Sequence, residues 1–170
     1  MATPVSVIID AFFHVIEEDD DFFDYYRLTD TESMQLATER ADALLTEALA
    51  MWRRRCTVGI PTKIVTEDID GVSVKVIESD LTTDEIDILA NLMFERYLSR
   101  DIAKFRKDEI NFTPKDLQKF SPSNSRKTFM AMYKDVHNYN TVLLKQYEDR
   151  NRDDGSLTVI DYGAYAEDNE

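Results

Sequence analysis

Apolar residues recur at helical spacing in four segments of this chain and alternate in a fifth. The clearest helical pattern lies between residues 79 and 107, where apolar side chains return every three or four positions. Its apolar stripe consists of Ile86, Leu89, Ala90, Met93 and Tyr97. A helix of this length would span roughly 40 Å at 1.5 Å per residue. We therefore expect a central helix around which the rest of the chain packs.

The two ends of this central helix are marked by capping and charge. Thr82 is placed to cap the first turn, where acidic side chains favour the positive end of the helix dipole. We expect the acidic residues to lie off the buried face; they are Asp84, Glu85, Asp87 and Glu95. Basic residues are expected at the C-terminal end of the helix, and they are Arg96, Arg100, Lys104, Arg106 and Lys107.

Three further segments have the same amphipathic periodicity. The spacing predicts helices over residues 4–18, starting at Pro4, over 31–55, capped by Asp30 or Thr31, and over 122–150. The apolar stripe of the first helix either docks onto the core or meets a neighbouring subunit, and we expect docking. Together the four segments predict a mainly α fold, a bundle of about four long helices.

The helical rhythm breaks between residues 57 and 79, where β-branched residues alternate with polar ones. Asp70-Gly71 is a two-residue turn signal between the two alternating runs, and it predicts a small β-hairpin near residues 63–77. Because two strands alone are marginally stable, this hairpin must pack on the helices or pair with another copy. We expect one helical domain over residues 1–154. Gly155 is expected to end the last helix, and 155–170 form an extended C-terminal arm with a short β-like run over 157–160.

Composition supports the helical interpretation and limits the partners. The chain has 170 residues, of which 43% are hydrophobic, with only four glycines and four prolines. So few turn-forming residues disfavour an all-β fold. The net charge of −14 opposes broad binding to nucleic acid, which favours protein partners. A single cysteine and the lack of a long apolar run predict a soluble protein in a reducing compartment, with no membrane association.

Candidate contact residues are charged or aromatic and fall in four places. The run EEDDD at residues 17–21 includes Asp19, Asp20 and Asp21, and its mutual repulsion requires solvent or a cationic partner. The aromatics that follow, at 22–26, are expected to fold beneath it. Arg53, Arg54 and Arg55 suit the end of the second helix, or they contact phosphate or an acidic partner. The remaining candidates are Asp70 and Gly71 in the hairpin and Tyr162 and Tyr165 in the arm.

Signatures of catalysis are missing from the sequence. Neither acidic stretch fits a calcium-binding loop, because each lacks a required carboxylate or glycine. The chain has no phosphate-binding glycine loop, no histidine pair at metal spacing and no nucleophile elbow. His14 and His137 are expected in helices as interface or core residues. We therefore expect a protein that is not an enzyme and that uses no cofactor and no metal.

Three motifs in order resemble the neck proteins of tailed bacteriophages of Gram-positive hosts, the head-to-tail connector or adaptor class. They are EEDDDFFDYY with TESMQLATERADALLTEAL, then ESDLTTDEIDILANLMFERYLSRDI, then TPKDLQKFSPSNSRKTF. The resemblance covers most of residues 10–150. It implies a structural virion protein that forms a homo-oligomeric ring, commonly a dodecamer, between the portal protein and the tail or a stopper protein. It also implies assembly in the host cytoplasm and genome DNA that passes through the ring without specific binding.

Two other classes remain open from the residues themselves. One is a small helical interaction or regulatory module that binds another protein through the N-terminal apolar stripe. The other is a metal-dependent hydrolase that uses the abundant carboxylates. Self-association distinguishes the first from a ring-forming connector, and metal titration tests the second.

Overall fold

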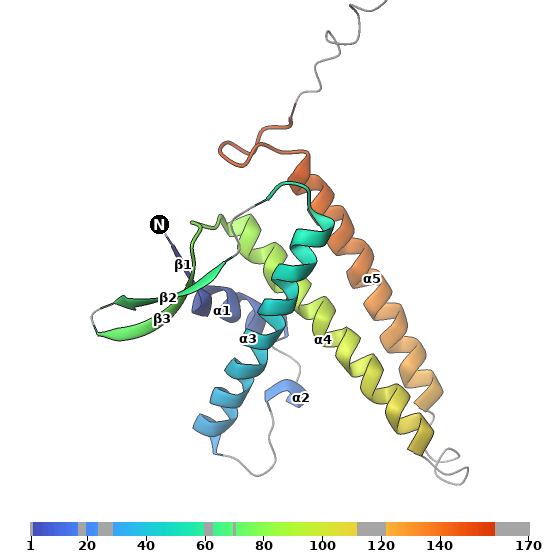
Figure 1. Ribbon diagram of the computed structural model, residues 1–170. Coiled ribbons are helices and arrows are strands. Elements are labelled where there is room, and N and C mark those ends of the chain that lie inside the picture. Colours follow the sequence, from blue (N-terminus) through green and yellow to red (C-terminus); the bar gives the residue numbers. More distant parts are fainter. Residues whose placement is uncertain are drawn as a thin grey trace, which may run out of the picture.

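The long helix α4 lies at the centre of the fold. The computed structural model describes residues 2–16, 20–23, 29–59, 63–69, 71–111 and 122–158. Helix α4 spans Thr83–Asn111 and contacts α1 (Val5–Val15), α3 (Asp30–Arg55) and α5 (Pro122–Glu148). Figure 1 shows α3 crossing α4, while α5 runs beside α4 in the opposite direction. The protein is mainly helical, and the predicted central position of the 79–107 helix is confirmed.

The helix starts follow local capping chemistry. At α4, the Glu85 N–H donates to Thr82 Oγ1 at 3.3 Å and the Thr82 N–H donates to Glu85 Oε2 at 2.8 Å, so the predicted cap is confirmed. At α3 the cap is Thr29, which exchanges the same pair of bonds with Glu32. The expectation of a cap at Asp30 or Thr31 was wrong, because both residues already belong to the helix.

The far end of α4 differs from the expectation. The helix continues to Asn111, and its last turn contains no basic residue. No glycine or proline interrupts residues 83–111, so nothing in the sequence stops the helix at Lys107. The cations from Arg96 onward therefore lie along the second half of α4 and not at its end.

A three-stranded antiparallel sheet joins the N-terminus to the predicted hairpin. Its order is β1 (Thr3–Pro4), β3 (Val72–Ile77), β2 (Ile64–Ile69). The hairpin is confirmed, and Gly71 in its turn has a φ of +80°, which glycine adopts readily. The third strand was not predicted. Pro4 precedes α1 instead of starting it, because a residue without an N–H is tolerated in an edge strand.

The hydrophobic core lies where α1, α3 and α4 meet. The N-terminal stripe is buried in it through Val5, Ile8, Ile9, Phe12 and Ile16, so the expected docking onto the core is confirmed. The one-turn helix α2 (Asp20–Phe23) adds Phe22, whose ring packs edge-on against Phe12 and Tyr97. Phe22 is fully buried, whereas Glu17, Glu18 and Asp19 of the acidic run beneath which it was expected lie outside the described residues. Tyr25 and Tyr26 lie outside the described residues.

Candidate functional site

A buried carboxylate joins α3, α4 and α5 at one point. Glu95 of α4 is 1% exposed and accepts two hydrogen bonds from Arg55 of α3, at 2.7 and 2.8 Å. From α5, His137 Nδ1 lies 2.9 Å from Glu95 Oε1 and Asn140 Nδ2 donates to Oε2 at 3.0 Å. Arg55 Nη2 also lies 3.3 Å from His137 Nδ1. Because the contact with Glu95 is shorter and a carboxylate only accepts, we assign the His137 proton to Nδ1, where it is donated to Glu95. One side chain thus ties the three long helices together.

The charge of Glu95 is stabilised by these donors. Burial raises the pKa of Glu95, but hydrogen bonds from Arg55, His137 and Asn140 outweigh burial and hold the pKa at about 2. The carboxylate is therefore ionised at neutral pH. Its bidentate geometry with Arg55 suits a charge-assisted pair and fixes the end of α3 against α4.

A second buried carboxylate holds the segment that follows α5. Glu85 is fully buried, and it accepts bonds from Arg152 Nε at 2.7 Å and from the Tyr147 hydroxyl at 2.5 Å. Arg152 also donates to the Asp80 carbonyl at 2.5 Å. Burial raises the pKa of Glu85, yet the bonds from Arg152, Tyr147 and the Thr82 backbone lower it overall. This cluster fixes residues 149–158 on the start of α4.

The segment after α5 forms a tight loop. Helix α5 ends at Glu148, so Gly155 does not terminate it as expected; Gly155 lies in the loop with a φ of +66°. The Asn151 N–H donates to the Ser156 carbonyl at 2.7 Å, and Leu157 forms a single β-bridge with Arg150. Residues 159–170, which make up most of the expected arm and include Tyr162 and Tyr165, lie outside the described residues.

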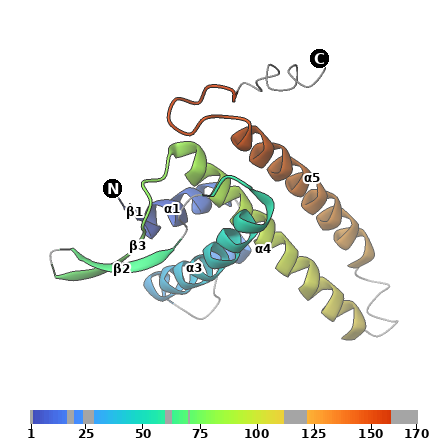
Figure 2. The ribbon, with the colours of Figure 1, turned by 45° about the horizontal axis from the view of Figure 1, so that its top comes forward.

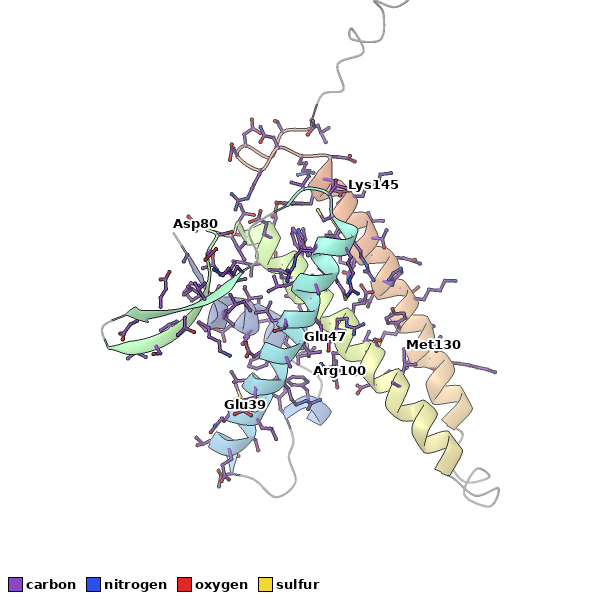
Figure 3. The ribbon with its side chains drawn as sticks, viewed as in Figure 1. Glu39, Glu47, Asp80, Arg100, Met130 and Lys145 are labelled. Atoms are coloured by element: carbon purple, nitrogen blue, oxygen red, sulfur yellow. The ribbon has the colours of Figure 1, made fainter. Side chains whose placement is uncertain are left out.

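A third cluster fastens the middle of α3 to α4. Glu47 accepts bonds from Arg96 at 2.7 Å and from Arg100 at 2.5 Å. Figure 3 shows Glu47 and Arg100 on the facing sides of these helices. All three side chains are about one-third exposed, so solvent weakens this cluster relative to the buried ones. Arg96 and Arg100 were expected to interact with the negative end of the helix dipole. They bind Glu47 of α3 instead.

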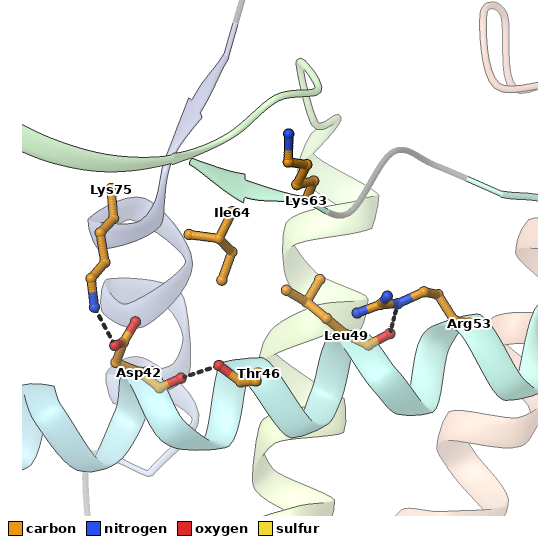
Figure 4. Close-up of a pocket in the computed structure, with 7 residues that line it drawn as sticks. All are labelled: Asp42, Thr46, Leu49, Arg53, Lys63, Ile64 and Lys75. Carbon is orange, nitrogen blue, oxygen red and sulfur yellow. Dashed lines mark hydrogen bonds and ion pairs between the residues drawn. The ribbon is translucent and has the colours of Figure 1, made fainter. Parts of the chain in front are cut away.

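The described residues form several hollows on the outside of this framework, among them one of about 620 Å³ between Val58 and the loop after α5. A hollow of about 700 Å³ lies between α3 and the hairpin (Figure 4). Leu49 and Ile64 give it an apolar floor, and its charged residues are Asp42, Arg53, Lys63 and Lys75. Lys75 pairs with Asp42 at 2.5 Å, and the Arg53 guanidinium donates to the Leu49 carbonyl of its own helix. We call this hollow the α3–hairpin groove.

Another hollow, of about 450 Å³, lies between α4, α5 and the loop after α5. Ile88, Leu143 and Tyr147 supply apolar surface, Asp84 and Asp87 lie on the α4 side, and Arg150 and Arg152 lie on the side of the loop. Within the part of the chain that the structure describes, neither aspartate forms an ion pair. We call this hollow the α4–α5 groove.

The predicted contact residues fall into different environments. Arg53 and Arg54 are exposed near the end of α3, whereas Arg55 is turned inward to Glu95. Gly71 is exposed in the hairpin turn. Asp20 and Asp21 belong to α2, and their side chains lie outside the described set. Asp19 and Asp70 lie outside the described residues.

Two buried residues lie where the sequence pattern did not predict them, and the role of a third residue was not predicted. Glu85 and Glu95 were expected off the buried face of α4, yet they are its most buried polar side chains. The Thr82-x-x-Glu85 capping box was a signal for Glu85. The signal for Glu95 was the pair His137 and Asn140, which fall on the inner face of α5 and need a polar partner. The role of Arg152 had no sequence signal.

Other features of the described residues bear on function. They contain no group of three or more His, Cys, Asp or Glu side chains placed to hold a metal ion. No helix among them is long and apolar enough to cross a membrane. Comparison with known proteins finds no matching family model, no matching curated protein and no matching solved structure. The fold and its surfaces thus define a mainly helical protein with a small antiparallel sheet.

Proposed function

We propose that this chain is a structural protein of the neck of a tailed bacteriophage, which joins the portal to the tail or a stopper protein as a ring of identical subunits. The three sequence motifs described above suggest the class. The structural observation that supports it is the hairpin β2–β3, which projects from the helical body on the side away from α5 (Figure 2). A projecting segment on a firmly braced body suits a subunit that grips its neighbours.

The rigid helical body also supports the proposal. A ring subunit keeps its contact surfaces at a fixed angle so that the ring closes after a set number of copies. Here Glu95 and Glu85 tie α3, α4, α5 and the loop after α5 into one framework. In the proposed ring, which is commonly a dodecamer, the helices form a four-helix body. In this proposal the C-terminal arm expected over residues 155–170 would contact the portal, the tail or a stopper protein; residues 155–158 belong to the loop after α5, and 159–170 lie outside the described residues.

Charge supports the passage of DNA through such a ring. The net charge of −14 repels phosphate and removes the contacts that give nonspecific affinity for nucleic acid. An acidic channel wall would let the genome slide without sticking. In this proposal the protein assembles in the host cytoplasm and resides in the virion neck. It works with neither catalysis nor a cofactor.

The alternative, a regulatory module that binds a partner through the N-terminal stripe, has less support. That stripe is buried against α3 and α4 in the described structure, so it offers no free surface there. A regulator would need another surface, such as one of the two grooves.

Electron microscopy of purified phage particles tests the proposal. A small tag fused after residue 170 should add density at the neck, repeated around the tail axis, and untagged particles serve as the control. Tag density on the capsid shell or along the tail tube, or particles that lack the protein, would contradict a neck location.

A further inference from the structure

The side of α5 that faces away from α4 carries three lysines. Lys127, Lys134 and Lys145 are seven and eleven residues apart, which at about 100° per residue places them on one face of the helix. All three are exposed, and none forms an ion pair within the part of the chain that the structure describes. Met130 lies between the first two and is 41% exposed. Figure 3 shows Met130 and Lys145 on the side of α5 away from α4. We call this surface the outer face of α5.

The carboxylates of α5 do not neutralise its outer face. The helix contains only two of them, Asp135 and Glu148. Asp135 lies about 100° from Lys134 around the helix axis. Glu148, at the end of the helix, accepts hydrogen bonds from the N–H and the hydroxyl of Thr57. In a chain with a net charge of −14, the outer face of α5 is therefore a cationic stripe that favours an acidic partner.

The solvent side of α3 has the opposite charge over its first half. Residues spaced alternately by four and three positions share one face of this helix and are exposed or half-buried; they are Glu32, Leu36, Glu39, Ala43, Thr46, Ala50 and Arg53. Its middle consists of small side chains, which let a second helix approach closely. Arg40, the only cation between residues 30 and 52, is directed to Phe22 of α2. We call this stripe the outer face of α3.

The two outer faces match in one parallel register. When Glu32 lies opposite Lys127, each residue of α3 faces a residue whose number is higher by 95. Opposite charges then meet at four levels, which are Glu32 with Lys127, Glu39 with Lys134, Arg53 with Glu148 and Arg54 with Asp149. Lys145 faces Ala50 and gains no partner. A shift by seven residues in either direction keeps the faces together but leaves only one such pair, so the charges select this register.

The directions of the two helices suit a contact between neighbouring copies. Helices α3 and α5 run in the same general direction along the molecule (Figures 1 and 2). Glu39 and Met130 lie on opposite flanks of the molecule in Figure 3. Rotation about an axis along that direction brings α5 of one copy beside α3 of the next in a parallel arrangement. Different surfaces on opposite flanks make head-to-tail contacts, which form a ring when the rotation closes.

We propose that the outer face of α5 in one copy packs in parallel against the outer face of α3 in the next copy, with Lys127 and Lys134 facing Glu32 and Glu39. This inference rests on the proposed ring function and identifies the interface that builds the ring. The occupant is a second copy because the chain itself supplies a helix face of matching length, spacing and order of charges.

Charge-swap variants test the register, with self-association of the full chain measured by sedimentation velocity and native mass spectrometry. The α3 swap is Glu39→Lys with Arg54→Glu, and the α5 swap is Lys134→Glu with Asp149→Lys. Neither swap changes the net charge of the chain. Each swap alone should weaken self-association about tenfold, because two facing pairs become like-charged. A chain that carries both swaps should associate as the wild type does, because every facing pair is again of opposite charge.

A matched control makes the same exchange of charge away from both outer faces. Asp10→Lys with Lys63→Glu changes two exposed positions, on α1 and at the root of the hairpin, and should associate as the wild type does. At about 1 M salt the Debye length falls to about 3 Å, so the difference between each single swap and the wild type should shrink.

The outcomes separate the interface from the proposed function. Recovery in the chain with both swaps shows that the single swaps act through the contact and not through misfolding. Single swaps that associate normally, or a combined chain with a wild-type circular dichroism spectrum that fails to recover, would overturn this interface and leave the ring to another surface. A wild-type chain that stays monomeric at its highest soluble concentration would also overturn it.

Nucleic acid is the other ligand that a lysine stripe can bind. Binding of a DNA duplex that the α5 swap abolishes, with self-association unchanged by that swap, would overturn the contact between copies and assign the outer face of α5 to nucleic acid. The neck location is decided separately by imaging of phage particles.

Discussion

Replacing Glu95 with glutamine is the sharpest test of how the three long helices are held together. Glu95→Gln keeps the size and the hydrogen-bonding capacity of the side chain but removes its charge. The Arg55 guanidinium is only 28% exposed, and the variant leaves it beside a neutral amide. We expect a marked fall in the free energy of unfolding at neutral pH, because a largely buried cation loses its counter-charge.

The magnitude follows from the pKa. In the folded protein the pKa of Glu95 drops from 4.5 to about 2. At about 1.4 kcal/mol for each whole unit of pKa, the ionised carboxylate contributes about 3 kcal/mol. This agrees with the 3–5 kcal/mol, roughly, that breaking a buried ion pair costs. Because the folded pKa is depressed, this contribution is complete above about pH 4.5 and is lost as the pH falls toward about 2.

Urea unfolding followed by circular dichroism measures the effect across pH. At about pH 7 the variant should be less stable than the wild type by about 3 kcal/mol, and the gap should narrow below about pH 4.5 as wild-type Glu95 takes up its proton. Glu39→Gln, an exposed change on α3, should stay within about 0.5 kcal/mol at every pH. The reasoning would be refuted if Glu95→Gln lowered the free energy of unfolding at neutral pH by no more than the control does. It would also be refuted if the difference between variant and wild type stayed the same down to about pH 2.

Two further substitutions, with smaller expected effects on stability, test other contacts that hold the fold together. Arg152→Ala should leave the Glu85 carboxylate buried without its cation and cost about 2 kcal/mol, less than for a fully buried pair because Arg152 is partly exposed. Amide hydrogen exchange should speed up across residues 149–158, and unchanged protection there would show that the loop is held by other contacts. Thr29→Ala should cost about 1 kcal/mol in thermal or urea unfolding through loss of the α3 cap. Thr31→Ala, inside the helix, should lower the free energy of unfolding by less than Thr29→Ala does. A larger loss for Thr31→Ala would indicate that Thr31 is the cap.

Helix positions were predictable because amphipathic periodicity records which face is buried. The stripe of Leu89, Ala90 and Met93 specifies the inner side of α4, and these residues are buried. The Asp70-Gly71 turn signal likewise located the hairpin, because few dipeptides adopt that turn. Helix ends were less predictable, since Thr29, Asp30 and Thr31 all cap well and only the three-dimensional context selects one.

The buried ion pairs were not predictable from the sequence, for a different reason. Sequence patterns assign charged residues to the surface, and for Glu85 and Glu95 this general tendency fails because their partners come from distant segments. Arg152 is 67 residues from Glu85, and Arg55 is 40 residues from Glu95. No local pattern encodes such pairs. Strand β1 was missed for a similar reason: the pairing of Thr3 with Ile77 depends on where α1 docks.

The buried joints and the exposed surfaces are physically linked. The side chains that hold α5 against α4, His137 and Asn140, lie on the same helix that forms one wall of the α4–α5 groove. Arg152 fixes the loop at the end of that groove by binding Glu85. Ion pairs in such positions contribute little net stability compared with apolar packing, but they accept only one geometry. In the proposed ring, an angular error at one subunit contact would be multiplied around the ring, so a helical body held in a single geometry suits that proposal.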